Sequence, residues 1–318
     1  MFRLIVARSA AEIDELRPAW ESLVNVECNL FQSFRWNRIA AERFADREAP
    51  YFIFAEDDNG IAVVPAVVRR NPELISFAGE ELFDYRDYLA AGDVRPLSQA
   101  FQHLSRLNLP LSIASICRPE AEMWRRLPKT LFSRAPRLIC GETSVSEFIH
   151  SHSRAFNRMR KLERMGLEIK TYSGESPVVR RIYELRARQS RPGELFDDHA
   201  RVDFMVSACR QEKTACEVFT LEHGGTLAAA LVTFRDEGFR RFYTTYYDRA
   251  WARYSPGVSL LFEISRRSLE DNLSFDLMTG EQGYKMRIAK SSQDLFQVKA
   301  TAAELRDALS ESAIEQAA

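Results

Sequence analysis

The stretch from Gly238 to Lys285 constrains the fold of this 318-residue chain more than any other. An aromatic, threonine-rich run that ends at Tyr246 is typical of a half-buried β-strand. A loop with Ser255-Pro256-Gly257 follows, then apolar residues at helical spacing and a short apolar run at 274–278. Strand, loop, helix and strand in this order aim free backbone N–H groups at a phosphate. The pattern predicts an α/β fold with an anion site, although the same pattern is also common as plain scaffold.

The size and composition of the chain predict a soluble, globular protein. A length of 318 residues is enough for two domains. Hydrophobic residues make up 46% and charged residues 28%, a balance that excludes a disordered chain. The formal net charge of -1 gives no support for a dedicated nucleic-acid-binding protein.

Cysteine and histidine usage predicts neither disulfides nor a metal site. The five cysteines are odd in number, include no Cys-x-x-Cys pair and stand at positions 28, 117, 140, 209 and 216. His150 and His152 have no further ligands near them in the sequence, so we expect no metal. The start of the chain lacks the apolar core of a signal peptide, and the longest apolar run, 227–232, is too short to cross a membrane. These features predict a cytoplasmic protein without membrane insertion.

Apolar periodicity and turn signals predict the same order of elements in both halves of the chain, β-α-α-β-β-β-α-β-α-β. In the first half, strands at 51–56 and 61–68 flank the hairpin signal Asp57-Asp58-Asn59-Gly60. In the second half, helices at 177–189 and 199–212 precede a further hairpin. The fold class is therefore expected to be α/β, with one copy of this arrangement in each half.

Six short motifs carry a resemblance to a known family. They are FQSFRWNRIAAERF, DYRDYL, RAFNRMRKLERMG, FYTTYYD, RYSPGVSLL and FDLMTGEQGYK, in this order. Together they resemble the CelD/BcsL group of acetyltransferases, and the order of elements is similar to that of GNAT-fold acyltransferases in the tandem FemAB arrangement. The resemblance implies two tandem GNAT-like domains, at residues 1–142 and 143–318, each with a mixed, mostly antiparallel sheet and flanking helices.

The resemblance also implies an activity. It points to an N- or O-acetyltransferase that takes acetyl-CoA as co-substrate and acetylates a hydroxyl or amine of a sugar or polysaccharide precursor. Members of the group are linked to bacterial cellulose and other exopolysaccharide systems, so an association with polysaccharide synthesis proteins is expected. Neither tRNA binding nor a metal is expected.

The donor site is expected in the second domain. In a GNAT fold the pantetheine arm lies between the splayed fourth and fifth strands, and the pyrophosphate lies at the start of the next helix, where the helix dipole favours negative charge. The residues that correspond here are Tyr246, Arg253, Ser255, Gly257, Val258 and Ser259. The chain departs from the GNAT loop pattern at one place, because Pro256 stands where a glycine is usual and Gly257 follows one position later.

Three residues after the donor helix are candidates for catalysis. Asp276 is a candidate base for the acceptor, Tyr284 a candidate acid for the departing thiolate, and Lys285 a candidate for stabilising negative charge. Each has a structural alternative: Asp276 bonded to backbone, Tyr284 in the core, and Lys285 as a solvated charge.

The first domain is expected to have lost its own donor site and to bind the acceptor. A segment rich in tyrosine and aspartate replaces the glycine-bearing loop there, and aromatic rings beside carboxylates suit sugars. The candidates are Trp36, Asp84, Tyr85, Asp87 and Tyr88. A polar segment that closes the domain, with Trp36 in the core, is the alternative.

Other functions stay open at this point. The first is a FemAB-type ligase that uses aminoacyl-tRNA on a cell-wall precursor. The second is a non-catalytic component of an exopolysaccharide synthesis complex, and the third is acylation of a protein or peptide. The basic helix 154–164 either contacts phosphates of a substrate or is a solvated face.

Overall fold

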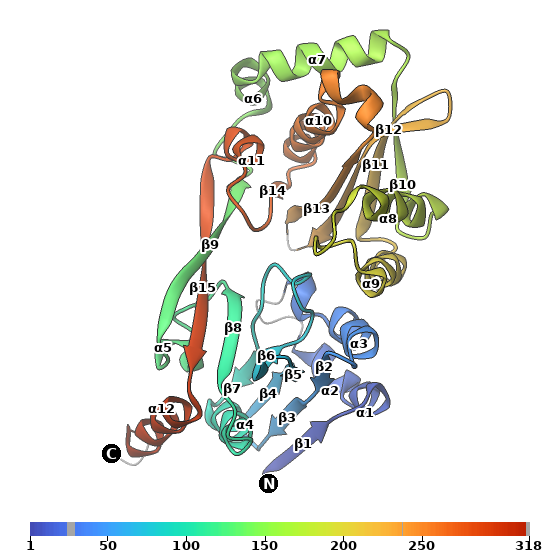
Figure 1. The fold of residues 1–318 in the computed structure, drawn as a ribbon. Helices are drawn as coiled ribbons and strands as arrows, with labels where there is room; N and C mark the ends of the chain where they lie inside the picture. The colour runs from blue at the N-terminus through green and yellow to red at the C-terminus, as the bar shows by residue number, and fades with distance from the viewer. Residues whose placement is uncertain (24–28, 237, 316–318) are drawn as a thin grey trace. The chain divides into compact units, whose positions relative to one another are not determined.

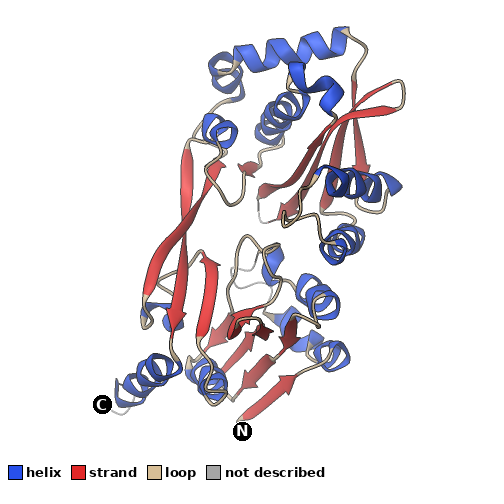
Figure 2. Ribbon diagram, viewed as in Figure 1, coloured by secondary structure: helices blue, strands red, loops and turns tan. Residues whose placement is uncertain are grey.

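The computed structural model describes residues 1–23, 29–236 and 238–315 of the chain, so the predicted free thiol of Cys28 lies outside the described residues. Helices and strands are mixed throughout this part of the chain (Figure 1). Sheets with flanking helices make up the structure (Figure 2), which confirms the predicted α/β class. None of the described helices is both long and apolar enough to cross a bilayer.

The chain forms two compact units. Unit 1 is Met1–Ser133 together with Asp294–Ala318, and unit 2 is Arg134–Gln293. The sequence pattern places the boundary at 142/143 and the C-terminal segment in the second domain. The structure instead groups that segment with unit 1, because β15 (Ser291–Ala300) pairs antiparallel with β8 (Leu111–Ile116).

Unit 1 is built on two sets of paired strands. One sheet has the antiparallel order β1 (Arg3–Ala7), β3 (Phe52–Glu56), β4 (Gly60–Val64) and β7 (Leu89–Gly92). The strands of the larger sheet in this unit follow the order β15, β8, β6 (Glu73–Phe77), β5 (Ala66–Arg70) and β2 (Glu48–Pro50). Within that set β6 and β8 run parallel and meet at Ile75 and Leu111.

The strand is interrupted at Pro65, where the chain passes from one sheet of unit 1 to the other. The predicted single strand 61–68 is wrong at this point, since β4 ends at Val64 and β5 begins at Ala66. Proline has no N–H to donate to a strand partner, so the pairing stops there. β4 pairs with β3, whereas β5 pairs with β2 and β6.

Helices cover the apolar sides of these sheets. They are α1 (Ala10–Glu15), α2 (Arg17–Ser22), α3 (Phe34–Arg43), α4 (Arg95–Ser105), α5 (Glu122–Arg125) and α12 (Ala302–Glu315), with the 3-10 turn η1 (Leu30–Gln32). Ser9 and Glu12 form the predicted capping box at the start of α1. Phe101 of α4 and Trp124 of α5 lie in the core that the helices share with β3, β4 and β8.

Unit 2 contains one run of six neighbouring strands. Their order is β10 (Glu168–Ser173), β11 (Cys216–His223), β12 (Thr226–Asp236), β13 (Phe239–Tyr247), β14 (Ser274–Asp276) and the end of β9 (Lys129–Leu138). All neighbours are antiparallel except β13 and β14, which run parallel. The parallel pair is the place where β13 is followed by a helical crossover.

The helices of unit 2 are α6 (Val145–Ser151), α7 (Ser153–Arg164), α8 (Pro177–Gln189), α9 (His199–Gln211), α10 (Pro256–Glu270) and α11 (Gly283–Ile288), with the 3-10 segment η2 (Arg249–Tyr254). Phe156 and Leu162 of α7 pack with Leu260 and Ile264 of α10 in one buried cluster. Tyr183 of α8 packs beside Phe196 before α9. The crossover helix α10 is buried along most of its length, so the strand–helix–strand unit forms the centre of unit 2.

Gly174 lies where the turn after β10 comes into contact with α9. A Cβ at this position would lie 1.9 Å from the carbonyl oxygen of Cys209 and 2.7 Å from its carbonyl carbon. Because the contact is with backbone, it cannot be relieved by a side-chain rotation. Gly174→Ala should therefore lower the free energy of unfolding by about 3 kcal/mol, as judged by urea denaturation.

Gly283→Ala is the matched control, because a Cβ there meets nothing within 4 Å and the backbone is not left-handed. That variant should unfold at the wild-type urea concentration. Equal stability of the two variants would contradict the close packing of α9 on the turn after β10.

Candidate functional site

The backbone of β13 loses its parallel partner halfway along the strand. β14 pairs with residues 239–241 of β13 and ends at Asp276, while β13 continues to Tyr247. The other edge of β13 stays paired with β12 as far as Tyr247. Within the described residues, no strand pairs with the β14-side edge of β13 beyond Arg241. This edge can therefore accept a ligand that offers amide-like hydrogen-bonding groups.

A buried ion pair joins β13 and β14 at their last paired position. Arg241 and Asp276 lie opposite each other in the register, and Nη1 of the arginine donates to Oδ2 of the carboxylate at 2.7 Å. Asp276 is 0% exposed and also lies 3.4 Å from Nε of Arg137. Its second oxygen accepts from the N–H of Met278 at 2.9 Å. A carboxylate held in this way cannot reach an acceptor, so the geometry favours a positioning role over the predicted role as base.

The start of α10 lies against the end of β13. Ser255 has a left-handed backbone, with φ 49° and ψ 52°, which turns the chain into Pro256 at the first helical position. A Cβ on Gly257 would lie 3.3 Å from Oγ1 of Thr245 and 3.6 Å from Cβ of Tyr247. The sequence suggests that Gly257 admits a phosphate; in the structure its missing side chain lets the helix approach the strand.

The first turn of α10 has backbone N–H groups for an anion. The N–H of Ser259 donates to the carbonyl of Ser255 at 3.0 Å. Gly257 and Val258 precede it, and N–H groups at these positions have no acceptor within a helix. The helix dipole adds partial positive charge at the same place. The sequence-predicted anion site therefore has the local geometry that it needs.

The remaining donor-site candidates differ in accessibility. Tyr246 is buried, and this burial raises the pKa of its hydroxyl. Arg253 is exposed and its guanidinium lies 4.6 Å from the ring centre of Tyr254. The hydroxyl of Ser259 is buried and has no hydrogen-bond partner among the described residues. Ser255, Gly257, Val258 and Arg253 can meet a ligand, whereas Ser259 faces the interior.

Helix α8 is bound to the unpaired half of β13. The hydroxyl of Tyr183 donates to Oγ1 of Thr244 at 3.3 Å, and Nε2 of Gln189 donates to the carbonyl of Tyr247 at 3.1 Å. Arg186 lies between them on the helix, with a buried Nε that has no hydrogen-bond partner among the described residues. Nothing in the sequence pattern of 177–189 marks Arg186 or Gln189, so neither could be predicted as a site residue.

Tyr284 is the candidate acid whose hydroxyl stays available. Its side chain is half-buried against the core of unit 2, and no hydrogen bond to its hydroxyl exists within the described part of the chain. Burial raises the pKa of Tyr284, and the charge of the nearby Arg186 lowers it by less. The hydroxyl is therefore protonated at neutral pH and has a cation near it.

Lys285 is buried rather than solvated. Its ammonium group donates to the carbonyl oxygens of Thr279 at 2.7 Å and Met278 at 3.4 Å, and lies 5.7 Å from the ring centre of Phe242. These bonds hold the turn after β14, where Met278 has a left-handed φ of 61°. The lysine places Tyr284 on α11 relative to β13, so a positioning role fits better than charge stabilisation.

The acceptor candidates of unit 1 are mostly inside the protein. Trp36 is 0% exposed, with its ring edge-on to Phe31 at 5.1 Å. Tyr85 and Tyr88 are buried as well, and Asp84 is half-buried.

Asp87 is at the centre of a buried polar network. Its carboxylate accepts from Nε of Arg118 at 2.6 Å, from Nε1 of Trp124 at 2.7 Å and from the N–H of Tyr88 at 2.9 Å. Burial raises the pKa of Asp87, and these partners lower it by less. The network favours the alternative interpretation, a polar segment that closes the domain, over a sugar-binding surface.

No metal centre is found in the described part of the chain. No group of three or more histidine, cysteine or acidic side chains there is placed to hold an ion. His152 instead packs between two phenylalanine rings, Phe148 at 4.6 Å and Phe262 at 5.1 Å between ring centres.

Part of unit 2 matches a known protein-family model. Residues 151–286 match the family model described as "Acetyltransferase (GNAT) domain". None of the curated protein sequences matches the chain. The unit 2 segment that holds β13, α10 and Tyr284 thus has the features of a GNAT-type acetyltransferase domain.

Solved structures show the same fold at low identity. L-PGS from Bacillus licheniformis has a TM-score of 0.60 at 9% identity, covering 90% of this chain and 91% of that chain. A tandem GNAT protein from the clavulanic acid biosynthesis pathway has 0.53 at 11%, covering 95% and 99%. FemX has 0.60 at 9%, covering 88% and 95%. These likenesses confirm the predicted tandem GNAT-like fold; the CelD/BcsL resemblance stays a prediction.

The role of Asp276 can be tested by its effect on stability. Asp276→Asn removes the buried carboxylate that pairs with Arg241 and lies 3.4 Å from Nε of Arg137, so that Arg241 keeps only its ion pair with Asp236. The change should lower the free energy of unfolding by about 3 kcal/mol. Asp203→Asn is the matched control, because this aspartate pairs with Arg180 on the surface, where such pairs contribute about 1 kcal/mol or less. Urea denaturation of both variants gives the comparison. If Asp276→Asn kept wild-type stability and lost only turnover, the carboxylate would be a base after all.

Proposed function

We propose that this protein is a GNAT-type acyltransferase that uses acyl-CoA, with acetyl-CoA as the expected donor, and acylates a hydroxyl or amine of a sugar or polysaccharide precursor. The observation that carries the donor assignment is the unpaired edge of β13 beside the start of α10. The match of residues 151–286 to the GNAT domain model supports the same reaction class. The sugar acceptor comes from the resemblance of the sequence motifs.

The residues at the start of α10 fit the diphosphate of CoA. The N–H groups of Gly257 and Val258 would donate to its oxygens, and Arg253 would add positive charge at the exposed side. The backbone of β13 beyond Arg241 would bond the amide groups of the pantetheine arm. When bound, the donor supplies a thioester carbonyl to the acceptor.

Tyr284 is the group that would supply a proton to the leaving sulfur. Its raised pKa keeps the hydroxyl protonated at neutral pH. Because its hydroxyl has no partner among the described residues, it is free to donate. Arg186 would stabilise the phenolate that is left. Lys285 and Asp276 would be positioning residues. Lys285 would hold the turn before α11, and Asp276 would hold β14 to β13 at their last paired position.

A FemAB-type transfer from aminoacyl-tRNA is the second candidate function. The fold likeness to the structure titled FemX, at a TM-score of 0.60, supports it. It differs from the first in its donor, since only the first predicts saturable binding of acetyl-CoA by the isolated protein.

Ser255→Asp tests the donor site without disturbing the fold. Aspartate tolerates a left-handed backbone and suits the start of a helix, so α10 should not be destabilised. Its carboxylate would lie where the diphosphate is expected, and the dissociation constant of acetyl-CoA should rise by about tenfold or more in calorimetry.

The control is Ser176→Asp, the same change at the residue that caps α8. It should leave the affinity for acetyl-CoA unchanged. The donor assignment fails if both variants bind acetyl-CoA like the wild type, and absence of saturable binding in the wild type itself would favour aminoacyl-tRNA.

Tyr284→Phe tests the acid. Removing one hydroxyl should lower kcat by roughly 10²–10⁴-fold with little change in donor affinity. Since burial raises the pKa of Tyr284, the wild-type rate should fall only when the pH rises above the ordinary range of tyrosine, and the variant should lack this alkaline fall. Tyr172→Phe, which removes a hydroxyl that donates to Glu222 on β11, should keep wild-type kcat. A wild-type pH profile in Tyr284→Phe would exclude this residue as the acid.

A further inference from the structure

A second cavity of unit 2 lies apart from the donor-site residues. It has a volume of about 390 Å³ and lies where the end of α6 and the first turns of α7 meet α10 and α11. Its side chains include Arg154 and Arg158 of α7, Arg287 of α11, His152 and Phe262. No carboxylate lines it. The volume is within the range of small-molecule sites.

The three arginines of this cavity have no ion-pair partner among the side chains that the structure describes. Within the described residues, no carboxylate forms an ion pair with Arg154, Arg158 or Arg287. Arg154 and Arg158 are four residues apart on one face of α7, where like charges destabilise a helix. A bound anion would remove this repulsion.

His152 fixes the third arginine relative to the other two. One imidazole nitrogen, Nε2, lies 2.8 Å from the carbonyl oxygen of Arg287, and the other, Nδ1, lies 2.9 Å from that of Phe148. The ring is also held between Phe148 and Phe262. The backbone of Arg287 is thereby joined to the α6–α7 junction, next to the turn of α7 that carries Arg154 and Arg158.

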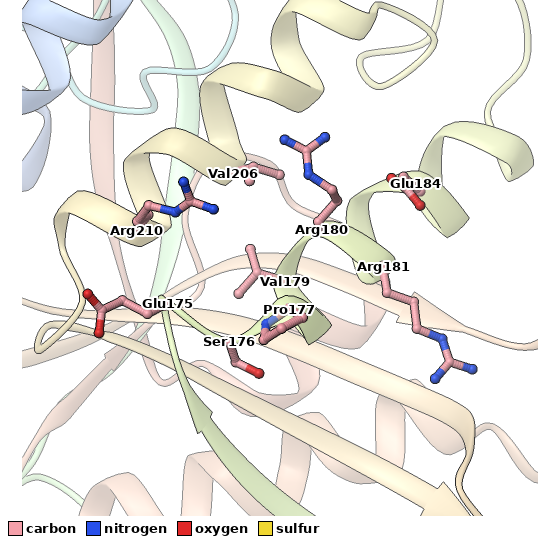
Figure 3. Close-up of a pocket in the computed structure, with 10 residues that line it drawn as sticks. Glu175, Ser176, Pro177, Val179, Arg180, Arg181, Glu184, Val206 and Arg210 are labelled. Carbon is pink, nitrogen blue, oxygen red and sulfur yellow. The ribbon is translucent and has the colours of Figure 1, made fainter.

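Another arginine-lined cavity of unit 2 lies beside α8 and can be compared with the cavity at α7. It has a volume of about 320 Å³ and is lined by Arg180, Arg181 and Arg210, but also by Glu175 and Glu184 (Figure 3). In the figure, Arg180 and Arg181 extend from α8 in different directions. The carboxylates in its lining distinguish it from the cavity at α7, whose lining has none.

We propose that the cavity formed by α7, α10 and α11 binds a phosphate-bearing ligand that is separate from the acyl donor. Guanidinium groups bond phosphate oxygens in pairs, and three of them without carboxylates match a diphosphate or a phosphate monoester. The separation from the donor rests on the lining, which includes none of the residues assigned to the donor site and no residue of β13 or β14.

The test is calorimetric titration with inorganic pyrophosphate. The wild type should show saturable binding, both alone and in the presence of saturating acetyl-CoA. The double variant Arg154→Gln/Arg158→Gln and the single variant Arg287→Gln should each bind about tenfold more weakly or less, since each loses charge-assisted hydrogen bonds. The control Arg181→Gln/Arg210→Gln removes two exposed arginines from the other cavity and should bind as the wild type does.

Three outcomes would overturn the proposal. The first is the absence of saturable binding, and the second is an equal loss in the control and in the cavity variants, which would indicate non-specific attraction. The third is loss, at a saturating concentration of acetyl-CoA, of the pyrophosphate binding that the cavity variants weaken, which would assign the cavity to the donor. The comparison of variants does not depend on the donor, so it tests the cavity even if acetyl-CoA does not bind. Circular dichroism spectra identical to the wild type establish that the variants are folded.

Discussion

The buried ion pair between Arg241 and Asp276 is the interaction on which the candidate site depends. It joins β13 and β14 at their last paired position, and beyond it β14 ends while β13 continues. Nε of Arg241 also donates to Oδ2 of Asp236 at 2.7 Å, and Nε of Arg137 lies near the carboxylate of Asp276. Burying these charges is unfavourable unless each has its partner, so the network fixes the register at one point. The unpaired edge of β13 begins directly beyond this ion pair.

The residues that follow the parallel strand pair differ between the two units. In unit 2 the parallel pair is followed by an open strand edge, by Gly257 at the start of α10 and by the free hydroxyl of Tyr284. In unit 1 the parallel pair β6 and β8 meets at one position only, and the segment after β6 buries Tyr88 and bonds Asp87 to Trp124. In unit 1 the side chain of Asp87 thus bonds to Arg118 and Trp124 within the unit. This difference supports the prediction that the first domain has lost its own donor site.

Local patterns in the sequence predicted the elements well but not their long-range partners. The apolar stripes at 177–189 and 199–212 correspond to α8 and α9, since a one-sided stripe depends on neighbours within two turns. By contrast, Asp276 bonds an arginine 35 positions away and Asp87 bonds a tryptophan 37 positions away, so a buried, paired carboxylate looks the same in the sequence as a catalytic one. The sequence likewise predicts an accessible charge at Lys285, because it does not show that the ammonium group bonds to the carbonyls of Met278 and Thr279. The start of α10 could be predicted because its signals, Pro256 and Gly257, are local.

The central claim is that the donor binds along β13 and at the start of α10, and amide hydrogen exchange tests it most directly. We expect acetyl-CoA to slow exchange at the amides of Gly257 and Val258 and along residues 242–247, with little change in unit 1. Slower exchange confined to unit 1, or no change anywhere in unit 2 at a saturating concentration of acetyl-CoA, would contradict it.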